Sequence, residues 1–253
     1  MRFETAPAIL LDVFDLRDRD RIVAFLTAEQ GQVRGVASGA RSKHSRFAGQ
    51  LQPLAKVGMT WIRKEGRDLV RISDVELVRP ATRLQSTLEG ILLGGCLADH
   101  MLHFAQENEA GSPLFRLLDS TLESLEAGVD PALAARYYET WMLRLAGIFP
   151  PPRECPLCGS AFEEGEGAAL GSASEALICR RCAAGEPATP VSAEALAFLR
   201  QTARTALPAL ATEPPAPAVL AEVEQLAGRI RRTFLGHELK SYEVMHRTLA
   251  ATF

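Results

Sequence analysis

The fold of the N-terminal part is indicated most directly by LAKVGMTWIRKEGRDLVRISDVELV, residues 54–78. Leu54–Arg63 and Leu69–Val78 are both rich in apolar and β-branched residues, which is typical of strands. Between them lies Lys64-Glu65-Gly66-Arg67, in which Gly66 is free to adopt the positive φ of a tight turn. The stretch therefore predicts a β-hairpin.

Three further strands are predicted upstream of this hairpin. They are Ala8–Leu16, Arg21–Thr27 and Gln32–Ala37, and a longer connection at 38–50 separates the third from the hairpin. Five short strands in about 80 residues suit a five-stranded barrel of the OB type. A small SH3-like barrel fits the same pattern almost as well.

After Pro80 the apolar residues recur at helical spacing instead of strand spacing. Ser-Pro and Asp-Pro pairs mark helix starts, and glycines mark helix ends. Residues 160–176 are rich in Gly, Ala and Glu and predict a loop or a flexible hairpin. The helical segments begin near Leu84, Ser112, Asp130, Ser192 and Ala218, and they end near Leu102, Gly128, Gly147, Leu207 and Leu235.

The predicted fold class is therefore α+β with more than one domain. Residues 1–80 form the OB-type barrel, and residues 81–253 form a mainly helical domain. A four-cysteine module resembling a zinc ribbon is inserted in the helical domain at about 150–190.

This module contains the most specific motif in the chain. Cys155-Pro-Leu-Cys158 is followed after twenty residues by Cys179-Arg-Arg-Cys182. Two Cys-x-x-Cys turns can place four thiolates around one Zn²⁺ at about 2.3 Å, with no position left for water or substrate. Gly159 permits a backbone twist after the first pair, and Arg153, Arg180 and Arg181 can offset the charge of four thiolates. The cysteines therefore predict one structural zinc ion in a reducing cytoplasm.

Other readings of the cysteines are weaker. A thioredoxin-like motif needs only one Cys-x-x-Cys in a βαβ unit, and an iron–sulfur cluster is chemically possible but less favoured by the spacing. Cys96, His100 and His103 lie at i, i+4 and i+7, so they share one helix face and form a rival metal site. We expect instead a core cysteine with two half-exposed histidines there.

Basic residues concentrate in the N-terminal part. Residues 1–80 hold 14 Lys and Arg against 10 Asp and Glu, whereas the remainder is acidic by 21 to 14 and the whole chain has a net charge of −3. DNA binding requires a local positive potential, and cations on loops neutralise phosphates without reading bases. Phe47 either stacks on a base or re-enters the core, and we expect the core. The candidate DNA-binding residues are Arg34, Arg41, Lys43, Arg46, Arg63, Lys64, Arg67 and Arg71.

Several function classes are disfavoured by missing motifs. The chain has no P-loop, no His-Glu-x-x-His, no Gly-x-Ser-x-Gly and no acidic cluster suited to catalytic metals. It has no run of about 18 apolar residues, and its first residues do not predict a signal peptide. We therefore expect a cytoplasmic protein that is not an enzyme and has neither a membrane partner nor a small-molecule substrate.

Short motifs along nearly the whole chain resemble the RecO family of recombination mediators. One departure is Cys182-Ala183, where the second Cys-x-x-Cys lacks the glycine that follows the first. The matching segments are Asp20–Val23, Leu26-Thr27, Gly31, Gly39–Arg41, Ser45–Phe47, Leu51–Pro53, Gly147–Pro150, Cys155–Gly159 and Leu239–Ser241.

The resemblance implies an ATP-independent protein that binds single- and double-stranded DNA and anneals complementary strands. It implies work with RecR and with single-stranded DNA-binding protein so that RecA loads onto DNA. It assigns DNA contact to Arg41, Lys43 and Arg46, and zinc to the four paired cysteines. Two alternatives remain: a protein-interaction adaptor that does not bind DNA, and a metalloenzyme that uses Cys96, His100 and His103.

Overall fold

A computed structural model describes residues 2–107, 109–173 and 175–252. The chain forms two compact units. Unit 1 comprises residues 1–128 and 239–253, and unit 2 comprises residues 129–238. The chain thus leaves unit 1 after Gly128 and returns to it at Leu239. None of the helices in the described ranges has the length and apolar character that a bilayer-spanning segment needs.

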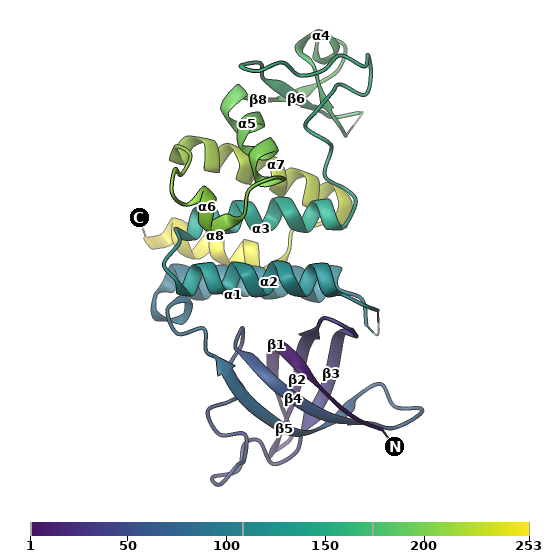
Figure 1. Ribbon diagram of the computed structural model, residues 1–253, viewed down its shortest axis with the longest axis vertical. Coiled ribbons are helices and arrows are strands. Elements are labelled where there is room, and N and C mark those ends of the chain that lie inside the picture. The colour runs from purple at the N-terminus through teal and green to yellow at the C-terminus, as the bar shows by residue number, and fades with distance from the viewer. Residues whose placement is uncertain (1, 108, 174, 253) are drawn as a thin grey trace. The chain divides into compact units, whose positions relative to one another are not determined.

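Unit 1 begins with five strands that form one closed sheet. The strands are β1 (Arg2–Leu16), β2 (Asp20–Thr27), β3 (Gly31–Ala37), β4 (Lys56–Arg63) and β5 (Val70–Arg79). Their order is β1-β2-β3-β5-β4, and β1 also pairs with β4, so the sheet closes on itself (Figure 1). All pairs are antiparallel except β3 with β5. The five predicted strands are confirmed.

Alternating side chains of these strands fill the interior of the closed sheet. Phe25 and Trp61 meet edge to face there with ring centroids 5.4 Å apart, and the Trp61 indole N–H donates to Glu4 Oε2 at 2.6 Å. Phe47 is also buried in this cluster, so it belongs to the core as expected. Such contacts between distant strands hold the closed sheet together.

Helices cover part of the outside of the closed sheet. The 3₁₀ turn η1 (Leu84–Ser86) leads into α1 (Leu88–Phe104), and α2 (Ser112–Glu126) and α8 (Lys240–Thr252) complete unit 1. α1 packs on β1, α2 on β2, and α8 on α1. The Asp119 carboxylate of α2 forms ion pairs with Lys56 of β4 and Arg79 of β5, each at 2.6 Å.

Unit 2 combines helices with a small sheet. Its helices are α3 (Pro131–Leu145), α4 (Arg180–Ala183), α5 (Ala193–Thr202), α6 (Leu207–Leu210) and α7 (Pro217–Leu235). Its strands are β6 (Ala168–Gly171), β7 (Leu177–Ile178) and β8 (Ala188–Val191), in the order β7-β6-β8. The cysteine segments lie before β6 and between β7 and β8, so this sheet connects the two Cys-x-x-Cys turns.

Three elements differ from the sequence prediction. β1 begins at Arg2 and passes through Pro7, because its first part pairs only with β4 and a proline is tolerated where its nitrogen faces away from the partner strand. The helix expected to reach Leu207 ends at Thr202. α8 was not predicted, although Leu239–Ser241 was noted as a motif.

Candidate metal centre and basic surface

The first Cys-x-x-Cys turn lies at the tip of a narrow loop. The Cys155 N–H donates to Ser160 O at 2.8 Å, and the Gly159 N–H donates back to Cys155 O at 2.8 Å. Gly159 has a φ of +70°, the left-handed conformation that glycine adopts without strain. This confirms the backbone twist expected at Gly159, and it places Cys155 and Cys158 on the same turn.

The second turn achieves the same spacing with a helix instead of a glycine. Cys179 precedes the single-turn helix α4, and the Ala183 N–H donates to Cys179 O at 2.9 Å. Ala183 remains helical, so no left-handed residue is required after Cys182. The missing glycine is therefore explained by a different local backbone that also holds two sulfurs together.

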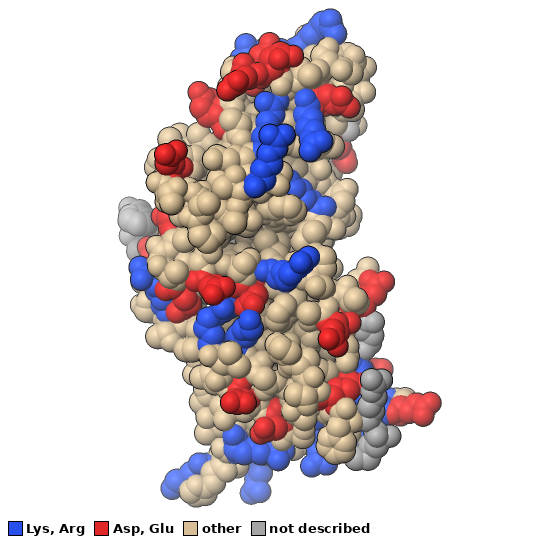
Figure 2. Space-filling view, viewed as in Figure 1, with Lys and Arg blue, Asp and Glu red and all other residues tan. Residues whose placement is uncertain are grey.

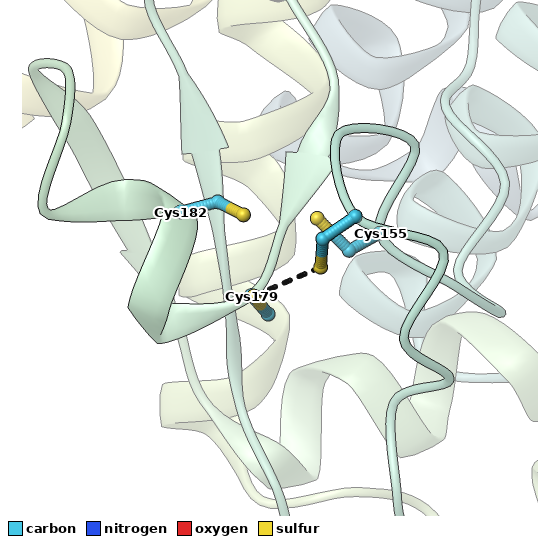
Figure 3. A group of neighbouring side chains, drawn as sticks. Cys155, Cys179 and Cys182 are labelled. Carbon is cyan, nitrogen blue, oxygen red and sulfur yellow. Dashed lines mark hydrogen bonds between the residues drawn. The ribbon is translucent and has the colours of Figure 1, made fainter.

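The two turns bring all four sulfurs together. Every pair of the Cys155, Cys158, Cys179 and Cys182 sulfurs lies within 4.8 Å, and Cys158 Sγ is 3.7 Å from Cys179 Sγ. Figure 3 shows Cys155 facing Cys179 and Cys182 across a shared centre. A tetrahedron with Zn–S bonds of about 2.3 Å requires sulfurs about 3.8 Å apart. The geometry therefore fits a single metal ion held by four cysteines.

The thiols influence one another's ionisation. The Ser160 hydroxyl and backbone N–H, together with the Arg181 guanidinium, lower the pKa of Cys158 to about 5. Hydrogen bonds with the Cys158 and Cys179 sulfurs raise the pKa of Cys182 to about 12. One thiol of the cluster is therefore easily ionised while Cys182 holds its proton, and a dication would favour the thiolate form of all four by displacing the protons. Arg153, Arg180 and Arg181 were expected to offset the thiolate charge, and of these Arg181 forms a hydrogen bond with the Cys158 sulfur.

The rival site on α1 has ordinary structural contacts. Cys96 is buried with its sulfur 3.8 Å from Met245 Sδ. His100 is buried beside Tyr242, with Nδ1 3.5 Å from the hydroxyl, and His103 Nδ1 lies 3.1 Å from Asp99 Oδ1. Over the residues that the structure describes, the four cysteines are the single group of three or more side chains able to hold a metal. The expectation of a core cysteine is confirmed, but His100 is buried and not half-exposed.

The basic segment after β3 is exposed. Lys43 and Arg46 have no carboxylate within ion-pair distance among the described residues, and the Arg46 guanidinium lies 4.8 Å from the centre of the Phe47 ring. Arg41 is partly neutralised, because its Nε lies 3.4 Å from Asp15 Oδ2, and its Nη1 donates to Arg17 O at 2.9 Å. The segment therefore presents two free cations and one that is fixed in place.

The second predicted cluster is only partly free. Arg63 donates to Gln30 Oε1 at 2.8 Å and lies 3.8 Å from Glu4 Oε2. Lys64, Arg67 and Arg71 are exposed, and no described carboxylate pairs with them. Arg34, on β3, forms an ion pair with Glu107 at 3.3 Å.

Several of the candidate DNA-binding residues lie along β3, whereas Lys64 and Arg67 lie in the turn between β4 and β5. Arg63 lies beside Gln30 just before the strand, Arg34 lies within it, Arg71 is opposite Val36, and the Arg41 segment follows its end. We call these cations, along β3 and in the turn between β4 and β5, the cation track. On the face shown in Figure 2, Lys and Arg side chains project from the end of the closed sheet away from α1 and α2.

Two further cations join this track in the structure. Arg17 and Arg19, in the turn between β1 and β2, are exposed, and their carbonyl oxygens accept hydrogen bonds from Arg41. In the sequence they alternate with Asp18 and Asp20, so the turn looked neutral. The signal that identifies them is the contact with a segment more than twenty residues away, which local charge counting does not contain.

A closed sheet with exposed cations and a four-cysteine centre within a second, largely helical unit define a class of modular protein with a candidate metal centre. The family model described as "Recombination protein O N terminal" matches residues 1–81, and "Recombination protein O C terminal" matches residues 85–243. The chain belongs to the RecO family, and this membership gives it a role in DNA repair and recombination.

Curated relatives agree with this assignment. The chain is 33% identical over 239 residues to DNA repair protein RecO from Anaeromyxobacter sp. (strain K), with 91% of each chain covered. It is 31% identical over 210 residues to DNA repair protein RecO from Geobacter sulfurreducens, which covers 83% of this chain and 84% of the relative. The similarity thus includes both units.

Proposed function

We propose that this protein binds single- and double-stranded DNA through the cation track, without ATP. The observation that carries the proposal is that Lys43, Arg46, Lys64, Arg67 and Arg71 are exposed and lack a carboxylate partner among the described residues. Cations that are not already neutralised bind phosphates with little regard to sequence. Arg34, Arg41 and Arg63 contribute less, because acidic side chains lie beside them.

Strand annealing follows from the same track. Two complementary strands repel each other through their phosphates, and a surface that neutralises part of that charge lowers the barrier to pairing. Membership in the RecO family supports recombination mediation as the setting: with RecR, the protein would help RecA to load onto DNA coated by single-stranded DNA-binding protein. We place this activity in the cytoplasm, at the nucleoid.

The other parts of the proposal concern structure. The strand order, with β1 closing on β4, supports an OB-type barrel as the DNA-binding domain, corresponding to residues 1–80. The cysteine centre and the sheet β7-β6-β8 support a zinc-ribbon-like module. Its four cysteines would hold one Zn²⁺ with no open position, so the metal would stabilise the module and take no part in a reaction. We therefore propose a protein that is not an enzyme and has no small-molecule substrate.

Fluorescence anisotropy with a labelled single strand, at two salt concentrations and without nucleotide, tests DNA binding. We expect affinity to fall steeply as salt rises, because each neutralised phosphate contributes a slope of about −0.7. The triple variant Arg41→Glu/Lys43→Glu/Arg46→Glu should bind much more weakly and with a shallower slope. A matched control is reversal of three exposed arginines outside the track and away from the cysteine turns, Arg116, Arg204 and Arg247.

Two results would contradict the proposal. One is absence of binding by the unaltered protein at low salt. The other is an equal loss of binding in both triple variants, which would mean that overall charge and not the track controls binding.

An adaptor that binds only proteins is the second candidate. The observation that favours it is Leu157, an apolar side chain 56% exposed at the tip of the first Cys-x-x-Cys turn. An adaptor would keep its protein partners when the Arg41, Lys43 and Arg46 charges are reversed, and it would show no DNA affinity to lose. The anisotropy measurement therefore separates the two functions.

A further inference from the structure

A row of paired residues crosses the outer face of the closed sheet. Phe14 of β1 is opposite Ile22 of β2, Ile22 is opposite Val36 of β3, and Val36 is opposite Arg71 of β5. The row continues around the sheet, because Arg71 is opposite Ile62 of β4 and Ile62 is opposite Phe3 of β1. We call these six residues the outer row. It begins and ends at a phenylalanine on the same strand.

The side chains of the outer row face away from the sheet interior. In a strand, neighbouring residues point to opposite faces, and directly paired residues point to the same face. The neighbours of the row members lie in the interior cluster or pack against it: Val13, Val23, Ala37, Trp61 and Ile72. The outer row therefore lies on the outside of the sheet, with Phe14, Ile22, Val36 and Arg71 forming its exposed part, whereas Ile62 is buried at 7% exposure between Arg71 and Phe3.

The helices of unit 1 leave this part of the outer face uncovered. Farther along β1 and β2, the outward residues Ile9, Ala24 and Leu26 are fully buried where α1 and α2 pack on the sheet. In contrast, Phe14 is 51% exposed and Phe3 is 68% exposed. Ile22 and Val36 are half-buried, and Arg71 is exposed. The outer face of the sheet is thus covered by α1 and α2 in one half. The other half, which carries Phe14 and Phe3, is open.

Cations lie around the open half. Arg71 is a member of the row, and Arg34 is two residues before Val36 on the same face of β3. The turn with Arg17 and Arg19 follows Phe14, and Arg41 is bonded to this turn. Arg34 and Arg41 have acidic partners, whereas no carboxylate among the described residues pairs with Arg17, Arg19 or Arg71. Apolar rings beside these unpaired positive charges suit a ligand that has both flat apolar faces and negative charge.

We propose that the outer row is a stacking surface for unpaired bases, with Phe14 and Phe3 as its platforms. The proposal rests on the DNA binding proposed above and adds that single strands are held by their bases as well as by their phosphates. In a duplex the base faces are already stacked on one another, so the rings would contribute to binding of single strands alone. Three strand-to-strand steps of about 4.8 Å, from Phe14 to Arg71, give the exposed part of the row a contour of about 14 Å, which accommodates about two or three nucleotides.

A protein segment is a less suitable occupant. The row contains Arg71 at its centre and is bordered by cations, whereas the core of a protein interface is typically depleted of charge. A single strand uses both features at once, because its bases stack on rings while its phosphates meet the flanking arginines.

The first test compares affinities for a 15-nucleotide single strand and for its duplex, in the unaltered protein and in Phe14→Ala. Loss of one stacked base should weaken single-strand binding by about 5- to 100-fold. Duplex binding should change by less than about 2-fold, since no base face is available. The matched control is Phe234→Ala, which removes a ring of similar exposure, 56%, from unit 2. Circular dichroism of each variant establishes that it is folded.

A second test detects stacking directly. In Phe14→Trp the indole would replace an exposed ring, whereas the native Trp61 is fully buried and the native Trp141 is partly buried in unit 2, where it donates to Thr202 O. Addition of oligothymidylate should quench the fluorescence of the variant well beyond the quenching seen with the unaltered protein. Addition of the duplex should not.

The outcomes distinguish this inference from the proposed function. Unchanged single-strand affinity in Phe14→Ala, with no extra quenching in Phe14→Trp, would overturn the stacking surface while salt-dependent DNA binding remained intact. Equal weakening for single strand and duplex would also overturn it, because the ring would then act only through the fold. If the unaltered protein binds neither form, the proposed function itself fails.

Discussion

At the scale of single residues, the acidic side chains decide which cations are available. Asp15 lies 3.3 Å from Arg21 Nε and 3.4 Å from Arg41 Nε, so one carboxylate neutralises part of two positive charges. The contact with Arg21 is local, because Asp15 and Arg21 are paired across the β1–β2 hairpin, whereas the contact with Arg41 forms only when the loop after β3 folds back on the β1–β2 turn. The sequence identified Arg41 as a cation but not its partner.

Replacement of Asp15 by Asn should therefore strengthen DNA binding. The change frees Arg21 and Arg41 without altering any cation, and we expect a several-fold higher affinity at low salt that disappears at high salt, because exposed charges are screened. Anisotropy with a labelled single strand measures it. Glu213→Gln changes the net charge equally from an exposed position in unit 2, and an equal gain there would show that net charge alone is responsible.

At the scale of elements, local signals located the starts of helices better than their ends. Asp130 and Ser192 cap α3 and α5 with hydrogen bonds to Leu133 and Ala195, as their sequence positions predicted. The end of α5 depends on another helix. The Trp141 indole and the Arg144 guanidinium, both from α3, donate to the carbonyl oxygens of Thr202 and Leu199, which a continuing helix would have used.

Dependence on a distant packing partner also explains why α8 was not predicted from the sequence. Its buried residues Tyr242 and Met245 contact His100 and Cys96 of α1, about 140–150 positions earlier in the chain. The stretch after Gly236 is short, and its pattern becomes clear only with its partner in place. Likewise, the strands and Cys-x-x-Cys turns were predictable because turn residues and ligand spacing are local, whereas the order of strands around the closed sheet is not.

The pairing of β3 with β5 can be tested with glycines. A Cβ on Gly35 would lie 2.8 Å from Val70 Cγ2 and 2.9 Å from Ile72 Cγ1, so Gly35→Ala should destabilise unit 1 by about 1–3 kcal/mol. A Cβ on Gly95 of α1 would meet nothing within 4 Å, and Gly95→Ala should stabilise by up to about 1 kcal/mol. Urea unfolding measures both. Equal effects of the two changes would contradict the close approach at Gly35.

The cysteine turns make a prediction about stability. Cys158→Ser should lose bound zinc and unfold the backbone around Arg153, Arg180 and Arg181, which trypsin would then cleave faster, because metal binding and folding of this module are coupled. Metal analysis and limited proteolysis measure the two effects. Cys96→Ala, which removes a thiol outside the cluster, should retain the metal. A Cys158→Ser protein that is free of metal yet as resistant to trypsin as the unaltered protein would refute the coupling.

At the scale of the whole molecule, the two units should respond separately to treatment. The cation track and the outer row belong to unit 1, and the cysteine centre belongs to unit 2. Removal of metal with a chelator should therefore increase amide hydrogen exchange within residues 153–191 and leave β1 to β5 protected. Affinity for single-stranded DNA should change by less than about 2-fold. A parallel loss of protection in both units would show that the metal stabilises the entire chain.

The return of the chain to unit 1 at Leu239 also determines an order of events during translation. All of unit 2 is synthesised before α8 and leaves the exit tunnel ahead of it, so the nascent closed sheet and α1 lack the helix that contacts Cys96 and His100 until α8 has emerged. Unit 2 is one continuous stretch of the chain, so it is complete before α8 emerges and can fold before unit 1 does. A premature stop codon within unit 2 would consequently harm the N-terminal unit as well, although every codon for β1 to α2 had been read correctly.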